Sequence, residues 1–176
     1  NCAAMQYGGF TVPEIDSVLA PYAEKSYKKY LSEFQQIVEE VGGSYDEEQA
    51  KEYALRRTSR EIEQGFQGFE HTFNTVASSR GDYPFTTFTG GCDDNFFASL
   101  VWSIALKVRR GGQGHKGHKR PAIFPKLVFL YTKDLHEEGK PLHWLYKEGI
   151  ACSAKAMYPD WLSLDLPDES LVTSAQ

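Results

Sequence analysis

Residues 79–91 read Ser79-Arg80-Gly81-Asp82-Tyr83-Pro84-Phe85-Thr86-Thr87-Phe88-Thr89-Gly90-Gly91. This stretch has the composition of a turn, then of a short strand, and it ends in a glycine pair. A helical pattern follows it, and then a second apolar run, Ile123-Phe124-Pro125-Lys126-Leu127-Val128-Phe129-Leu130-Tyr131. Strand, helix and strand in this order are typical of a parallel βαβ unit. The sequence therefore predicts an α/β fold organised around that unit.

Two long helical patterns precede the first strand. Apolar residues recur at spacings of three and four from Ile15 to Val41, and again from about Asp46 to Val76, with Gly42-Gly43 between them. Pro13 suits the first helical turn, whereas Pro21 predicts a kink or an early break. Two such helices joined by a short loop are expected to pack antiparallel as a hairpin. Their aromatic stripes fit either a core or a subunit interface: Tyr27, Tyr30, Phe34, Phe66, Phe69 and Phe73.

The pattern after the first strand predicts a helix capped by Asp94 and ending at Arg109-Arg110, followed by a glycine-rich loop. The second strand is apolar nearly throughout, which predicts burial on both faces. Pro125 indicates that this strand is irregular or begins after the proline. Pro141 opens a last helical pattern that fades near Tyr158-Pro159, and the tail from Asp165 has no pattern.

Composition narrows the class of protein. The chain has 176 residues, is 41% hydrophobic and 14% aromatic, and carries a net charge of -5, which fits a globular domain and disfavours bulk nucleic-acid binding. No apolar run approaches the ~20 residues of a membrane span. Three widely spaced cysteines without a CxxC pair favour a reducing compartment, and hence the cytoplasm.

Topology separates the loops into two groups. Parallel α/β sheets bind ligands beyond the carboxyl ends of their strands, so the loops at 89–95 and 132–134 are expected to face a site together. The substrate-side candidates lie in or beside the first strand: Arg80, Thr87, Thr89, Gly90, Gly91 and Cys92. Two of these have plainer interpretations, because Cys92 fits a small buried residue and Arg80 fits an ion pair with Asp82.

A basic run enters the second strand and is expected at the opposite rim. Its members have no acidic residue between them: Lys107, Arg109, Arg110, His115, Lys116, His118, Lys119 and Arg120. The run fits a phosphate cradle or a solvated loop, and its position at the entry to the strand favours the loop. His115 and His118 lack a nearby cysteine or carboxylate, so no metal site is predicted there.

Five motifs occur in one order at characteristic spacings, and they carry a resemblance to a known family. They are Gln6-Tyr7-Gly8-Gly9-Phe10, Leu19-Ala20-Pro21-Tyr22, Ser79 to Thr89, Ile123 to Phe129, and Cys152-Ser153-Ala154-Lys155-Ala156-Met157-Tyr158-Pro159-Asp160. In this respect residues 1–165 resemble an internal segment of the anaerobic, class III ribonucleoside-triphosphate reductases. Members of that family commonly read Thr-Phe-Gly where this chain has Thr89-Gly90-Gly91, and an apolar residue where it has Cys92.

The resemblance implies a glycyl-radical enzyme that makes deoxyribonucleotides inside a ten-stranded α/β barrel. It implies a glycyl radical and a structural zinc as cofactors, ATP and deoxynucleotides as effectors, and a homodimer activated by a radical-SAM enzyme. The radical cysteine of the family lies in a Met-Gly-Cys-Arg motif, which this sequence does not contain, and neither the terminal radical-glycine motif nor the four-cysteine zinc site is present. No catalytic residue is therefore assigned in this segment, and the segment alone is expected to be inactive.

The resemblance also divides the chain. Residues 1–76 correspond to a helical hairpin of the dimer and effector region, 77–164 to part of the barrel, and 165–176 to an irregular tail. The glycine-rich start supplies the effector-binding candidates, Gln6, Gly8 and Gly9. The alternative is a non-catalytic nucleotide-binding or dimerisation module derived from the same fold. A different glycyl-radical enzyme fits the order of the motifs less well.

Overall fold

The computed structural model of the chain describes residues 9–75, 85–115 and 117–165. Its helices and strands, in chain order, are β1 (Phe10–Val12), α1 (Ile15–Glu40), α2 (Glu47–Thr75), β2 (Thr86–Gly90), α3 (Phe96–Gly111), β3 (Lys126–Tyr131), α4 (Lys133–His136), α5 (His143–Ala156) and β4 (Asp160–Ser163). The candidate residues Gln6, Gly8 and Arg80 lie outside the described residues, as does the turn that the sequence predicts before β2.

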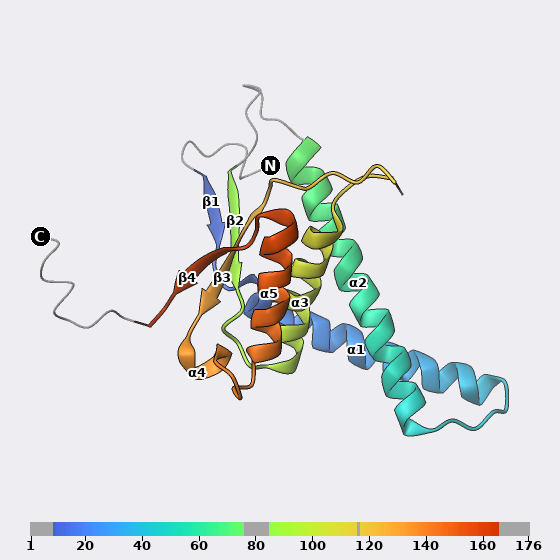
Figure 1. Cartoon of the computed structure of the whole chain (residues 1–176). Coiled ribbons are helices and arrows are strands. Elements are labelled where there is room, and N and C mark those ends of the chain that lie inside the picture. Colours follow the sequence, from blue (N-terminus) through green and yellow to red (C-terminus); the bar gives the residue numbers. More distant parts are fainter. Residues whose placement is uncertain (1–8, 76–84, 116, 166–176) are drawn as a thin grey trace, which may run out of the picture.

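The strands form one parallel sheet in the order β1-β2-β3-β4. The central pair, with Phe88 opposite Leu127, is the parallel unit that the sequence predicts, and α3 connects its two strands. The sheet has two further strands that the sequence analysis did not predict. β1 adds to one edge and β4 to the other, so the hairpin of α1 and α2 is the connection between β1 and β2 (Figure 1).

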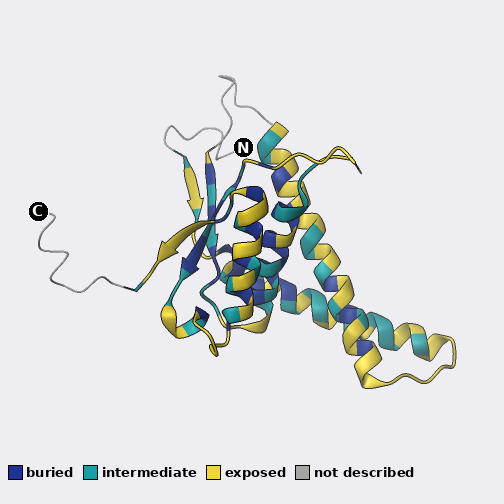
Figure 2. Ribbon diagram, viewed as in Figure 1, coloured by how far each residue is buried: buried dark blue, intermediate teal, exposed yellow. Residues whose placement is uncertain are grey.

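Helix α3 occupies the centre of the structure because it is apolar on nearly every side. Trp102 and Val101 are fully buried, as are Phe129 of β3 and Leu145 of α5. Figure 2 shows the buried residues gathered where β2, β3, α3 and α5 meet, while the far end of the hairpin is mostly exposed. Burial of this apolar area is the main force that holds the sheet to its helices.

Several details of the helices differ from the expectations. Asn95, not Asp94, caps α3, and its side chain accepts hydrogen bonds from the backbone N–H groups of Phe97 and Ala98 at 2.9 and 3.3 Å. Helix α1 begins at Ile15 and runs through Pro21 without being split, although the proline removes one backbone hydrogen bond.

The later start of β3 after Pro125 is confirmed, since the strand begins at Lys126. Its burial on both faces is found in part. Leu127 and Phe129 pack against the helices, whereas on the other face Leu130 is buried and Val128 is half-buried. In Figure 1 the described helices α3 and α5 lie on the side of the sheet opposite to that second face. None of the helices within the described ranges is long and apolar enough to cross a membrane.

Candidate functional site

The loops after β2 and β3 meet at one edge of the sheet, as the sequence predicts. β2 ends at Gly90 and β3 at Tyr131, and the two strands are parallel neighbours. The ring of His136, in the short helix after β3, lies against the backbone of the β2 loop: its Nε2 donates to the carbonyl oxygen of Gly91 at 2.7 Å. We call this edge the carboxyl rim and define it by residues 89–95 and 132–136.

The peptide groups at Gly91 are held from two sides of the structure. Asp16, near the start of α1, accepts a hydrogen bond from the Gly91 N–H at 2.7 Å through its Oδ2. His136 binds the Gly91 carbonyl and accepts at Nδ1 from the N–H of Thr132 at 3.1 Å. Both side chains are 1% exposed. Residues 75 and 45 positions away along the chain thus fix the loop backbone rigidly at the carboxyl rim.

The glycine pair is required by this packing. Gly91 has a φ of 104°, which residues with a side chain rarely adopt. A Cβ on Gly90 would lie 2.7 Å from a ring carbon of Trp102 and 2.8 Å from Oδ1 of Asp16. Trp102 therefore occupies the space that a side chain at position 90 would need.

Asp16 is the most perturbed carboxyl group at this rim. Burial raises its pKa from 3.8 to about 6, while the hydrogen bond from Gly91 acts in the opposite direction. Its Oδ1 and the indole N–H of Trp102 have no hydrogen-bond partner among the described residues. The other oxygen of Asp16, Oδ2, anchors the glycine loop through the Gly91 N–H. The hydroxyl of the neighbouring Ser17 donates to Asp93, in the same loop, at 2.7 Å.

Asp16→Asn should remove a pH-dependent loss of stability. The pKa of Asp16 is higher in the folded chain than its usual value, so folding favours the protonated carboxyl group. The stability that this group contributes is therefore fully present below about pH 4 and is lost as the pH rises through about 6. The asparagine amide keeps an oxygen that can accept from Gly91. The difference in unfolding free energy between variant and wild type should grow by about 3 kcal/mol in favour of the variant from acid to neutral pH.

Urea unfolding of both proteins at several pH values measures this difference. Asp94→Asn is the matched control, because Asp94 is exposed and lies in the loop whose Gly91 N–H Asp16 binds. Parallel pH profiles for wild type and Asp16→Asn would show that Asp16 titrates normally.

The remaining rim candidates present polar groups on the face of the sheet away from the helices. Thr87 and Thr89 are half-buried there, and the Thr89 hydroxyl accepts from the backbone N–H of Glu14 at 2.9 Å. Cys92 is half-buried with a free thiol. Burial raises the pKa of that thiol, so it is protonated at neutral pH and is no thiolate nucleophile. The hydroxyl groups of Thr87 and Thr89 are therefore the polar side-chain groups that these candidates place on that face.

The other candidates lie away from this rim. Gly9 precedes β1, beside Phe85 at the amino end of the sheet, and the N–H of the next residue, Phe10, donates to the Phe85 carbonyl at 2.8 Å. Cys152 is fully buried between α5 and α3, and its thiol donates to the carbonyl of Leu106 at 3.2 Å. The described residues contain no group of three or more histidine, cysteine or acidic side chains placed to hold a metal ion.

The basic run lies at the opposite rim, as the order of the strands requires. Lys107, Arg109 and Arg110 lie in the last turns of α3, and in the loop after it Gln113 pairs with Arg120 through two backbone hydrogen bonds of 2.8 Å before β3. Lys116 lies outside the described residues. Arg109, the best buried member of the run, is bonded to Glu70 of α2 rather than directed at the carboxyl rim.

Sequence reasoning missed Asp16 and His136, which hold the loop. One signal for Asp16 was present: it occupies a position of α1 four and seven residues before the buried Ala20 and Ala23, so an acid interrupts the inward-facing stripe. For His136 no such pattern exists, because its helix has only four residues.

Comparisons with known proteins agree with the motifs. A family model described as anaerobic ribonucleoside-triphosphate reductase matches residues 1–175. A reductase of that name from Haemophilus influenzae is 38% identical over 161 residues, which are 90% of this chain and 21% of the relative. The Escherichia coli protein of that name is 35% identical over 160 residues, 90% of this chain and 21% of the relative. That of Enterobacteria phage T4 is 32% identical over 164 residues, 92% of this chain and 25% of the relative.

The chain thus spans about a fifth to a quarter of the length of these curated relatives. The family model covers nearly all of it, and the parallel sheet with a long helical hairpin is the kind of fold that the resemblance implies. This chain belongs to the anaerobic ribonucleoside-triphosphate reductase family.

Proposed function

We propose that the chain is a segment of an anaerobic reductase that converts ribonucleoside triphosphates to deoxyribonucleotides by glycyl and thiyl radical chemistry. The observation that carries the proposal is the family match over residues 1–175. In this proposal the four parallel strands are part of a ten-stranded barrel, and the sheet face without helices, which bears Thr87 and Thr89, is directed to its interior. The rest of the reductase chain supplies the remaining strands and the radical residues.

The carboxyl rim is the proposed substrate side. The Gly91 peptide groups, clamped by Asp16 and His136, give the loop a fixed backbone. The proposed contributors are Thr87, Thr89, Gly90, Gly91 and Cys92, together with Arg80, which lies outside the described residues. Their proposed role is to bind and orient a ribonucleotide, because the sequence lacks the radical cysteine and radical glycine motifs of the family.

The structural zinc of the family does not fit this chain. The two cysteines described are separated, with Cys152 buried and bonded to Leu106 and Cys92 at the carboxyl rim. No step of the reaction is assigned to zinc or to the glycyl radical here. Both are proposed for other parts of the whole reductase, together with activation by a radical-SAM enzyme, deoxynucleotide effectors near Gln6, Gly8 and Gly9, and a cytoplasmic location.

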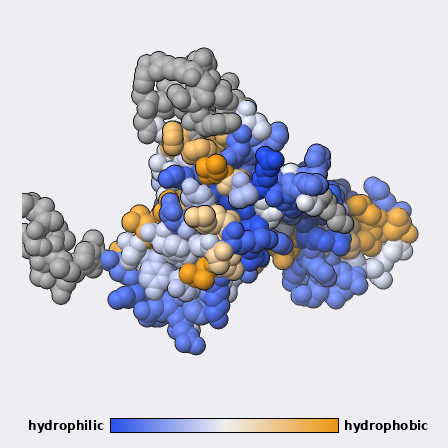
Figure 3. Space-filling view, turned by 45° about the horizontal axis from the view of Figure 1, so that its top comes forward, coloured by the Kyte–Doolittle hydropathy of each residue, from blue (hydrophilic) through white to orange (hydrophobic). Residues whose placement is uncertain are grey.

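The hairpin is the proposed contact of a homodimer. Part of its aromatic stripe is used internally: Phe69 and Phe73 pack on Phe88 of β2 at ring distances of 5.7 and 6.1 Å, and Phe34 packs on Tyr53 at 5.0 Å. Other apolar side chains stay uncovered. Ile37 and Val41 are 46% and 76% exposed near the turn of the hairpin, where Figure 3 shows hydrophobic side chains at the right-hand end of the molecule.

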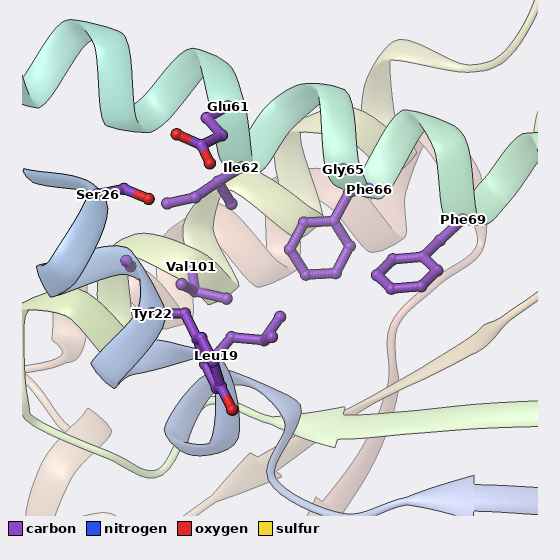
Figure 4. Close-up of a pocket in the computed structure, with 10 residues that line it drawn as sticks. Leu19, Tyr22, Ser26, Glu61, Ile62, Gly65, Phe66, Phe69 and Val101 are labelled. Carbon is purple, nitrogen blue, oxygen red and sulfur yellow. The ribbon is translucent and has the colours of Figure 1, made fainter. Parts of the chain in front are cut away.

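An apolar hollow of about 180 Å³ lies along the same hairpin. Phe66 and Phe69 of α2 reach toward Leu19 and Tyr22 of α1 across it (Figure 4). Tyr22 is 67% exposed, which is unusual for an aromatic side chain beside a hollow. A helix face of a second copy is the proposed cover.

Tyr22→Glu is expected to weaken the dimer by about tenfold or more, because it places a charge in an apolar contact. Light scattering of the chain over a range of concentrations measures the effect. Ile150→Glu on α5 is the control, since Ile150 is 44% exposed and away from the hairpin. A wild-type chain that stays strictly monomeric at high concentration would refute the dimer proposal.

The isolated chain is expected to reduce no ribonucleotide, because its sequence lacks the radical cysteine and radical glycine motifs. The test is an anaerobic assay of the chain with the activating radical-SAM enzyme, a reductant and ribonucleoside triphosphates. Turnover by this polypeptide alone would contradict the proposed division of labour between this segment and the rest of the reductase.

A further inference from the structure

A second hollow lies at the rim opposite to Gly91, and nothing in the proposed reaction uses it. Its volume is about 400 Å³, and it is bounded by the last turn of α3, by the loop that leads to β3, and by the last turn of α5. Arg109 is among its lining residues, but the Arg109 side chain is 0% exposed and is paired with Glu70 at 2.7 Å. The cations that are open to the hollow are Arg110, Lys119, Arg120 and Lys155.

These open cations outnumber the acids beside them. Glu148 pairs with Arg110 at 3.4 Å, whereas Lys119, Arg120 and Lys155 have no carboxylate within ion-pair distance in the described part of the chain. The carboxyl ends of α3 and α5 together offset about one positive charge. About two positive charges therefore remain without a counter-charge.

The backbone presents the cations in a fixed arrangement. Two hydrogen bonds between Gln113 and Arg120 turn the loop back over the end of α3, and the Lys119 ammonium group lies 4.0 Å from the position of a Cβ on Gly111. Gly112 has a φ of 70°, and a Cβ there would lie 2.8 Å from the Arg120 carbonyl oxygen. The loop is thus already shaped, so a ligand need not order its backbone on binding.

Two apolar side chains are exposed beside the same hollow. Met157 directly follows Ala156 and is 86% exposed, and Ile123 lies two residues after Pro121 and is 58% exposed, while Ala156 and Pro121 both line the hollow. Met157 also ends α5 with a φ of 60°, the left-handed conformation that glycine favours at this position of a helix. Packing within the chain does not require a methionine there, which points to a contact outside the chain.

The combination of charge and apolar surface indicates the class of ligand. Carboxylates match the open lysine and arginine side chains, and an aliphatic side chain matches Ile123 and Met157. Phosphate groups alone would leave both apolar side chains exposed. A long nucleic acid fits less well, because 107–120 holds six of the 19 lysine and arginine residues and no acid, which leaves the rest of the chain strongly acidic.

We call these side chains the basic-apolar face: Arg110, Lys119, Arg120, Ile123, Lys155 and Met157. We propose that an acidic segment of the reductase chain outside residues 1–176, with an aliphatic side chain among its carboxylates, covers this face in the whole enzyme. The inference rests on the proposed function, in which this chain is one part of a longer reductase. Its relatives leave ample chain for such a segment, since this chain spans 21% to 25% of their length.

Calorimetric titration of the 176-residue chain with a short peptide of glutamates around a central pair of leucines tests the chemistry of the face. Lys119→Glu/Lys155→Glu should weaken binding by about tenfold or more, because attraction becomes repulsion at two positions. The matched control is Lys140→Glu/Lys147→Glu, which makes the same charge change at exposed positions nearer the other end of α5. Circular dichroism confirms that both variants keep the helix content of the wild type.

Two altered peptides and one anion separate the alternatives. Replacing the glutamates by glutamine, or the leucines by serine, should weaken binding, and inorganic triphosphate should compete poorly. Absence of peptide binding, equal weakening by the two double variants, equal binding of the serine peptide, or tighter binding of triphosphate would overturn the proposal.

Chemical coupling identifies the source of the segment. The protein used is the Escherichia coli relative in which the stretch 35% identical to this chain is replaced by this chain. A carbodiimide, which joins amines to carboxylates in contact, should couple Lys119 or Lys155 to an aspartate or glutamate outside the exchanged stretch, and mass spectrometry identifies the pair. The exposed Lys140 and Lys147 are the controls and should couple far less.

Coupling only within the exchanged stretch, or only between two molecules in a mixture of isotope-labelled and unlabelled protein, would overturn the proposal. Formation of deoxyribonucleotides by the same protein tests the proposed function separately. An active protein without the expected coupling would therefore disprove this inference alone.

Discussion

Glu70→Ala is expected to lower the free energy of unfolding by about 3–5 kcal/mol, because it leaves the Arg109 guanidinium buried without its counter-charge. The pair is almost inaccessible to water, with side chains 0% and 4% exposed. Glu70 also accepts from the Gln113 side chain at 2.9 Å, so one carboxylate connects α2, α3 and the loop before β3. Urea unfolding of variant and wild type, followed by circular dichroism, measures the loss.

Two variants serve as controls for that loss. Glu148→Ala removes the partner of Arg110 in an ion pair whose side chains are 39% and 32% exposed, and it should cost about 1 kcal/mol or less. Glu70→Leu/Arg109→Met removes both buried charges and should be more stable than Glu70→Ala. Equal losses for Glu70→Ala and Glu148→Ala would show that burial of the Arg109 pair does not decide its energy.

Gly90→Ala is expected to destabilise the chain by about 1–3 kcal/mol, the cost of overpacking a filled core. The new methyl group would meet the Trp102 ring at 2.7 Å and the Asp16 carboxylate at 2.8 Å, and both side chains are fully buried. Because these side chains also hold the loop at Gly91, the variant should loosen the carboxyl rim. The rate of hydrogen exchange at the Gly91 N–H reports directly on that loop, and exchange is expected to be faster in the variant than in the wild type.

Gly68→Ala is the matched control with the opposite sign. Gly68 lies inside α2 and a Cβ there would have no atom within 4 Å, so alanine should stabilise the helix by about 0.5–1 kcal/mol. Loss of stability in both glycine variants to the same extent would mean that the contacts with Trp102 and Asp16 are not the cause.

The central strands were predictable because their signals are local. Phe88 and Leu127 lie in apolar runs bounded by glycine or proline, and the helix between them has a clear period. The parallel pairing, and with it the sorting of loops to opposite rims, then followed from topology. The handedness of that connection, expected to be right-handed, remains a prediction.

The edge strands were not predictable by the same means. β1 and β4 have three and four residues, too few for an alternating pattern, and every residue of β4 is exposed. Their strand geometry comes from pairing with a neighbour. The N–H of Phe10 donates to the Phe85 carbonyl, and that of Leu164 to the Tyr131 carbonyl, each at 2.8 Å. Only the fold brings these partners together.

The residues at the carboxyl rim were likewise predictable only in part. Gly90 and Gly91 could be singled out because a glycine pair ends the strand, whereas Asp16 could not be assigned to them across 75 residues. The apolar pattern of α1 was also ambiguous about which side faces inward. Val18 and Tyr22 fit the stripe but are 53% and 67% exposed, while Asp16 is buried. Contacts with α2 and α3 decide the orientation, and these are tertiary.

The most direct test of the proposed function is an anaerobic ribonucleotide reductase assay of a segment exchange. In the Escherichia coli relative, the stretch that is 35% identical to this chain is replaced by the matching residues of this chain. We predict that the exchanged protein, after activation, forms deoxyribonucleotides from ribonucleoside triphosphates. An exchanged protein that folds and shows the glycyl-radical signal in electron paramagnetic resonance, yet forms no deoxyribonucleotide, would contradict the account.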